Sequence, residues 1–93
     1  MRITWTIEAL DDVENILAYY YEQSWPATAE AVEARIALAI EKLRDFPERI
    51  RASDRIPGAR ELGIHRLPYI AFVCVTVDEI QVLNIVHSMR KFP

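Results

Sequence analysis

Apolar positions recur along this chain with two different periods, which predict two helices followed by three strands. Within residues 7–25 and 26–46, apolar side chains return every three or four positions, the spacing of one helical face. Pro26 fits the first position of the second helix, and Pro47 ends that helix. Two long helices joined by so short a connection predict an antiparallel hairpin. The expected apolar stripes are Leu10, Val13, Ile16/Leu17 and Tyr20 in the first helix, and Val32, Ile36, Ala39/Ile40, Leu43 and Phe46 in the second.

A shorter period governs the flanks of this hairpin. Residues 2–5 read as a strand with Ile3 and Trp5 on one face, and Thr6 is suited to cap the first helix. Beyond a charged loop at 47–58, residues 60–67 alternate. This alternation places Leu62 and Ile64 on one face together with Arg60 and Arg66. It places Glu61 and His65 on the other face.

The last two strands complete a sheet. Residues 69–77 are apolar on both faces, which is typical of a central strand, and residues 80–87 return antiparallel after a tight turn at Asp78-Glu79. The predicted fold is therefore α+β in the order β-α-α-β-β-β. An antiparallel sheet packs against a helical hairpin in one domain that spans residues 1–93.

The net charge, the cysteine count and the lengths of the apolar runs exclude several classes of protein. The net charge is −3, but residues 1–46 carry −5 and residues 47–93 carry +2, so an anionic partner would approach the second half. A single cysteine, Cys74, excludes an internal disulfide. No apolar run reaches the roughly 20 residues of a membrane span, and the acidic N-terminal segment is unlike a signal peptide. The expected location is the cytoplasm.

Candidate chemistry is concentrated near the strand ends. The histidine and cysteine spacings match no metal site, and two glycines build no nucleotide-binding loop, so neither a metal nor a cofactor is expected. Arg60 and Arg66 would project from one strand face, and guanidinium groups that converge there could clamp a phosphate or carboxylate. Alternatively, each arginine is solvated or pairs with Glu61, Glu48 or Asp54.

His87 and Tyr69 each have two interpretations. His87 could act as a general acid or base, the usual role of a catalytic imidazole, or its ring nitrogen could simply bond the backbone at the strand end. Tyr69 follows Pro68, which favours an aromatic residue that anchors the turn over a catalytic phenol.

The chain resembles the ParE/RelE superfamily of type II toxin–antitoxin toxins over nearly its whole length. A departure is Ile50-Arg51, where many relatives carry Gly-Arg. The features that carry the resemblance are Trp5 and Thr6, Ala9 with Asp12-Val13, Ile16 and Tyr20, Pro26 with Ala29, Leu43 and Pro47, Gly58 with Arg60-Glu61-Leu62, Pro68-Tyr69, the Val75/Ile80/Val82/Leu83 hairpin, and His87 with Arg90.

The resemblance implies a small toxin that is neutralised by a cognate antitoxin. ParE-like members poison DNA gyrase by binding, and RelE-like members cut mRNA in the ribosome. The tail from His87 to Arg90 is more similar to ParE. In addition, an acidic chain with no lysine in residues 47–89 is poorly matched to ribosomal RNA. A third alternative is an inactive module that retains antitoxin binding.

Each alternative assigns roles to named residues. A gyrase inhibitor would use a target-binding surface and no catalytic group, whereas an endoribonuclease would use His87 or Tyr69 for proton transfer and Arg60 for charge stabilisation. An amphipathic antitoxin segment is expected to cover exposed aromatic side chains on the first helix and its connection. The expected target-binding residues are Arg51, Arg60, Arg66, His87 and Arg90, and the expected antitoxin-binding residues are Tyr19, Tyr21 and Trp25.

Overall fold

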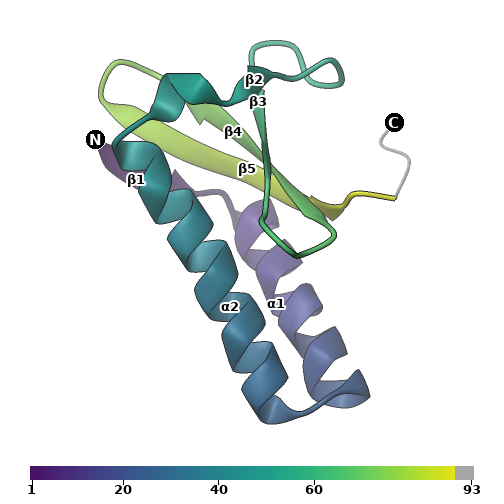
Figure 1. Ribbon diagram of the computed structural model, residues 1–93. Helices are drawn as coiled ribbons and strands as arrows, with labels where there is room; N and C mark the ends of the chain where they lie inside the picture. The colour runs from purple at the N-terminus through teal and green to yellow at the C-terminus, as the bar shows by residue number, and fades with distance from the viewer. Residues whose placement is uncertain (90–93) are drawn as a thin grey trace.

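The computed structural model describes residues 1–89 and consists of a five-stranded sheet with a helical hairpin on one face (Figure 1). The strand order is β1-β5-β4-β3-β2, and β1 is the only strand of this described sheet that pairs parallel to its neighbour. The elements are β1 (Arg2–Trp5), α1 (Ile7–Gln23), α2 (Pro26–Glu41), the 3-10 turns η1 (Lys42–Arg44) and η2 (Pro47–Arg49), β2 (Arg51–Ala52), β3 (Arg60–Gly63), β4 (Tyr69–Val75) and β5 (Glu79–His87).

The helix ends form as the sequence predicts. The Thr6 hydroxyl accepts a hydrogen bond from the Ala9 N–H at 3.0 Å, which caps α1, and Pro26 occupies the first turn of α2. Figure 1 shows the two helices side by side, with their connection projecting well past the edge of the sheet. The α+β fold class and the helical hairpin are thus confirmed.

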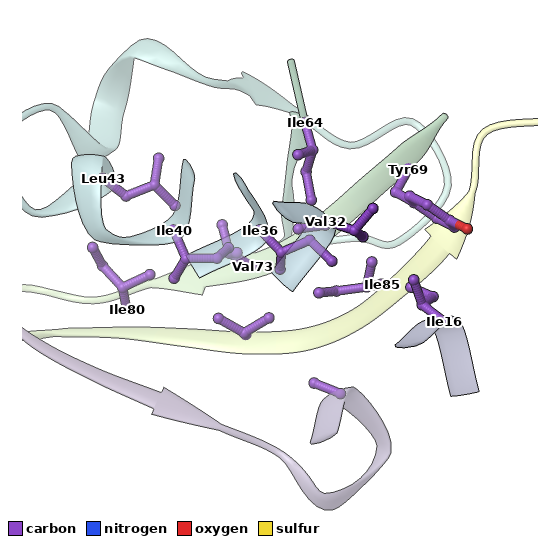
Figure 2. Packing of buried hydrophobic residues seen from close by; sticks show 13 residues of the cluster. Ile16, Val32, Ile36, Ile40, Leu43, Ile64, Tyr69, Val73, Ile80 and Ile85 are labelled. Atoms are coloured by element: carbon purple, nitrogen blue, oxygen red, sulfur yellow. The ribbon is translucent and has the colours of Figure 1, made fainter. Parts of the chain in front are cut away.

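The main core lies between this hairpin and the sheet. Figure 2 shows Val32, Ile36 and Ile40 of α2 lying over Val73 of the central strand β4 and Ile85 of β5. Both faces of β4 are covered, because Val73 and Phe72 point in opposite directions and are each fully buried. This burial confirms the predicted central strand, although the strand ends at Val75 and not at Val77, which is exposed. Among the described residues, no helix is long and apolar enough to cross a membrane.

Several predicted boundaries were wrong. The α-helical geometry of α2 ends at Glu41, and the chain continues as a 3-10 turn, a common tightening at a helix end. The segment 47–58, predicted to be a loop throughout, contributes the two-residue edge strand β2. Two residues of the predicted apolar stripes, Leu10 and Phe46, are 54% and 55% exposed.

The strand predicted over residues 60–67 stops at Gly63, which changes where two arginines lie. Arg66 adopts a left-handed backbone conformation with φ 62° inside the β3–β4 turn. Arg60 and Arg66 therefore do not project from one strand face, as the simple alternation predicted. Strand alternation cannot be extended through a residue whose backbone reverses direction.

A register shift in the β4–β5 pair sets the orientation of the last strand. Phe72 pairs with Asn84 whereas Val73 pairs with Val82, so Leu83 is an extra residue on β5, as in a β-bulge. Beyond the bulge the side-chain alternation is reversed: Val82 faces the core before it and Ile85 faces the core after it. The bulge therefore turns Ile85 and His87 toward the helices.

Beyond the end of β1, two side chains at the start of α1 supply hydrogen-bond partners to backbone groups of β5 that no strand pairs. The Thr6 hydroxyl donates to the Leu83 carbonyl at 2.7 Å, and the Asp12 carboxylate accepts from the Ile85 N–H at 2.8 Å. A half-buried N–H would otherwise lose its partner on folding. Asp12 thus fastens the helix to the bulged strand.

Replacing Asp12 with alanine is expected to lower the free energy of unfolding by about 1.5–3 kcal/mol, the usual value of a hydrogen bond to a charged group. Urea denaturation followed by circular dichroism measures the change. Asp11→Ala is the matched control, because Asp11 lies on the same helix and is exposed. Equal stabilities of the two variants would contradict a fastening role for Asp12.

Candidate functional site

A hollow of the described residues lies between α1 and the ends of the central strands. Its volume is about 780 Å³, and we call it the aromatic hollow. Side chains from α1, from the start of β4 and from the end of β5 meet in it, and three of them are tyrosines. Its lining is Asp12, Asn15, Ile16, Tyr19, Tyr20, Pro68, Tyr69, Ile85, His87 and Met89.

Tyr69 and His87 are in direct contact within the aromatic hollow. They are paired across β4 and β5, and their rings meet edge to face with centroids 5.6 Å apart. Burial raises the pKa of the Tyr69 hydroxyl to about 12, and hydrogen bonding with Tyr20 contributes to the rise. Tyr69 therefore stays protonated at neutral pH. His87 Nδ1 accepts from the Met89 N–H at 3.1 Å, which fixes the ring at the strand end.

Arg60 does not join this pair. It lies opposite Val73, which is four positions along β4 from Tyr69, a separation of roughly 13 Å along the strand. Its guanidinium donates to the Ile50 carbonyl at 2.9 Å. The three residues expected of an endoribonuclease are thus divided between two regions of the sheet.

Arg51 holds a buried carboxylate on the sheet face opposite the helices. Its guanidinium lies 3.0 Å from Glu61, whose side chain is 3% exposed, and the Ser53 hydroxyl donates to the same carboxylate at 2.7 Å. The Ser53 oxygen also accepts from the N–H groups of Arg55 and Ile56. This cluster fixes the segment after β2 onto the sheet. Pairing with Glu61 was the alternative that the sequence left open beside a role of Arg51 in target binding.

The Ser53 hydrogen bond, followed by the contacts with Arg51, lowers the pKa of the Glu61 carboxyl, while burial opposes the shift. Each of these bonds favours the charged form of the carboxylate. Glu61 therefore binds its proton less readily in the folded chain than in the unfolded one.

A second hollow, of about 560 Å³, lies between α2 and β3, and we call it the basic hollow. Arg66 lines it, together with Arg35 and Lys42, which the sequence analysis did not single out. A signal was present, because Arg35, Leu38 and Lys42 follow one another at helical spacing along α2 and into η1. The complete lining is Arg35, Leu38, Ala39, Lys42, Leu43, Phe46, Leu62, Gly63, His65 and Arg66.

The other expected site residues are dispersed. Tyr19, Tyr21 and Trp25 are 57%, 52% and 77% exposed on α1 and at the hairpin connection, and only Tyr19 of these three lines a described hollow. Arg90 lies outside the described residues. A third hollow lies between α1 and α2, and it has Glu14 and Glu33 in its lining beside Leu10.

Comparison with known proteins decides the class. Residues 3–92 match the family described as the ParE toxin of the type II toxin–antitoxin system, parDE. The chain belongs to the ParE toxin family. "Putative toxin Y4kP" of Sinorhizobium fredii is 35% identical over 92 residues, which is 99% of this chain and 93% of that protein.

A solved structure shares the fold of this ParE-family chain. It is described as the chromosomal ParDE TA system from P. aeruginosa, with a TM-score of 0.85 and 29% identity over 94% of this chain and 95% of the other. The resemblance read from the residues is confirmed by both comparisons. The aromatic and basic hollows are therefore surfaces of a ParE-family fold.

The buried Glu61 predicts a specific acid response of this ParE-family chain. Its pKa is lowered on folding from the ordinary value of 4.5, so the stability it contributes is full above that pH and is lost as the pH falls through the folded pKa. Thermal unfolding measured between about pH 6 and pH 3 should show a smaller decrease in Tm for Glu61→Gln than for the parent chain. Glu48→Gln, an exposed site, is the control. Parallel Tm profiles for all three proteins would contradict the assignment.

Proposed function

We propose that this chain is a toxin that inhibits DNA gyrase by binding it and that a cognate antitoxin neutralises it. The observation that carries the gyrase assignment is the dispersal of the charged groups that RNA cleavage would need. Arg60 donates to the Ile50 carbonyl, far along the sheet from Tyr69 and His87. A phosphate bound beside His87 would have no guanidinium from Arg60 to stabilise its developing charge.

The overall charge supports the same proposal. The chain carries −3 at neutral pH and has no lysine between residues 47 and 89. A protein that works within the ribosome must approach a dense array of phosphates, for which a strongly basic surface is the usual solution. Membership of the ParE family supports the gyrase proposal over the ribosomal one, and the proposed site of action is the cytoplasm.

The proposed target surface is the end of the sheet where β3, β4 and β5 meet solvent. Arg66 is exposed in the β3–β4 turn, and His87 ends β5, which the Ser88 N–H joins to that turn through the Pro68 carbonyl. Arg90 follows in the sequence. Arg51, whose side chain is 67% exposed despite its bond to Glu61, and Arg60 extend the proposed surface along the sheet.

Purified gyrase tests this proposal directly. Added toxin should block supercoiling or cause cleaved DNA to accumulate, and Arg66→Asn should raise the inhibitory concentration by roughly tenfold, as expected when a central contact is removed. Asparagine is chosen because it tolerates the left-handed backbone at this position. Arg55→Asn, at another exposed arginine, is the control. Normal supercoiling at saturating toxin would overturn the gyrase assignment.

The antitoxin is proposed to cover exposed aromatic side chains of the hairpin. Tyr19, Tyr21 and Trp25 present large apolar areas to solvent, and such areas commonly mark protein interfaces. Growth arrest on expression of this chain, relieved by the antitoxin gene beside it, is the corresponding cellular observation. Unimpaired growth would instead favour an inactive module that retains only antitoxin binding.

A second candidate is a ribosome-dependent endoribonuclease, and the contact between Tyr69 and His87 is the observation in its favour. In that case His87 would transfer the proton, and Tyr69, which keeps its own proton at neutral pH, would donate a hydrogen bond. Primer extension on translated mRNA should then show codon-phased cuts that His87→Ala reduces by about 100-fold or more. Intact transcripts, or cuts that persist in His87→Ala, would eliminate this candidate.

A further inference from the structure

Strand β1 leaves one margin of the sheet open. It ends the strand order, so within residues 1–89 no strand pairs with its outer side (Figure 1). The N–H groups of Arg2 and Thr6 donate at 3.0 Å each to carbonyls of β5 and of the turn before it. Because a parallel strand directs the N–H and C=O of every second residue to the same side, the backbone groups of Ile3 and Trp5 point outward.

The open stretch of β1 is short, and its limits are fixed by the structure. Met1 comes before Ile3 on the outer side, and its carbonyl accepts a hydrogen bond from the Arg44 guanidinium. After Trp5, Thr6 caps α1 and the chain continues as a helix. Two residues of β1 therefore present N–H and C=O groups that a further strand could bond.

The sequence of β1 is compatible with the addition of a strand. Edge strands of soluble proteins are commonly protected from pairing by a proline, a lysine, a bulge or a charged side chain directed inward. β1 has neither a proline nor a lysine, and its register with β5 is regular. Its charged residue, Arg2, precedes the open stretch and has a side chain that is 72% exposed.

We infer that the outer side of β1 binds a second copy of this chain, with the two β1 strands antiparallel. Ile3 of each copy then lies opposite Trp5 of the other, and each of these two pairs exchanges two backbone hydrogen bonds. Thr4 lies opposite Thr4 at the two-fold axis, and threonines are favourable neighbours across strands. Both copies use the same surface, so the contact closes as a dimer and leaves neither β1 open.

Charge and apolar surface favour a second copy as the occupant. The register places Arg2 opposite Thr6 of the other copy, next to the first turn of α1, which carries Glu8. The two copies of Arg2 stay roughly 13 Å apart along the strands. The same register brings Met1 beside Ile7, which are 40% and 75% exposed, and their contact removes apolar surface from water.

Sedimentation velocity of the purified chain, separated from its antitoxin, tests the dimer. The contact is small, so we expect a dissociation constant on the order of 10 µM and a dimer at roughly 100 µM protein. Ile3→Pro removes the outward N–H without removing a bond to β5, so this variant should be monomeric. Ile3→Ala loses the same side-chain packing but keeps the N–H, and it should still dimerise. Circular dichroism shows whether both variants are folded.

A pair of cysteine variants tests the register and does not alter the backbone of the edge. Facing Cα atoms in a non-hydrogen-bonded antiparallel pair are about 4.5 Å apart, within the range that a disulfide spans. With Cys74→Ser in both proteins, Thr4→Cys should therefore form a covalent dimer under mild oxidation. Arg2→Cys is the control on the same strand, because its two copies would be roughly 13 Å apart and should stay unlinked.

The outcomes are decisive for the dimer and independent of the target. A monomeric parent chain at roughly 100 µM would overturn the inference, as would an Ile3→Pro variant that dimerises like Ile3→Ala. Equal crosslinking of Thr4→Cys and Arg2→Cys would show unspecific association and would also overturn it. A monomeric chain in which Ile3→Pro, but not Ile3→Ala, weakens antitoxin binding would assign the edge to the antitoxin instead. Gyrase inhibition is measured separately, since a monomer could still inhibit gyrase.

Discussion

The reversal of side-chain alternation at Leu83 is the constraint on which the rest of this structure depends. It lets β5 bury Ile80 and Val82 against the hairpin and then Ile85 on the same side. Without the extra residue, the segment after it would present Asn84 and Val86 to the core. Thr6 and Asp12 stabilise this irregular segment with one bond to its carbonyl and one to its N–H. A residue of helix α1 thus determines which way the end of the sheet faces.

This constraint also arranges the chemistry. Because His87 follows the bulge, it meets Tyr69 under the helices and not on the opposite face of the sheet. The arginines that appear clustered in the sequence have separate structural partners: Arg51 is bound to a buried carboxylate, and Arg60 to a backbone carbonyl. The cations that line the basic hollow lie elsewhere: Arg35 is on α2, Lys42 is in η1 and Arg66 is in the β3–β4 turn. Proximity in sequence was a poor guide to proximity on the surface.

Most of the fold could be predicted from the sequence, because helical periodicity, capping by Thr6 and the position of Pro26 are local properties. The central strand was equally clear from its apolar run, although its predicted end at residue 77 lies two residues beyond the observed end at Val75. The bulge could not be predicted, because Val82, Leu83 and Ile85 are compatible with two alternations. The left-handed Arg66 and the two-residue β2 depend on distant contacts, so the basic hollow, which combines that turn with α2, was missed.

The shortness of β2 has a consequence for the life of the chain before it meets any partner. A sheet whose outer strand is covered for two residues leaves the following backbone groups open, and open strand edges are templates for pairing with other chains. Neither a proline nor a lysine blocks β3 at Leu62 or Gly63. Production of this protein in excess of its partner therefore favours aggregation. Synthesis of the chain and its partner in balanced amounts protects both the solubility of the chain and the partner's control over it.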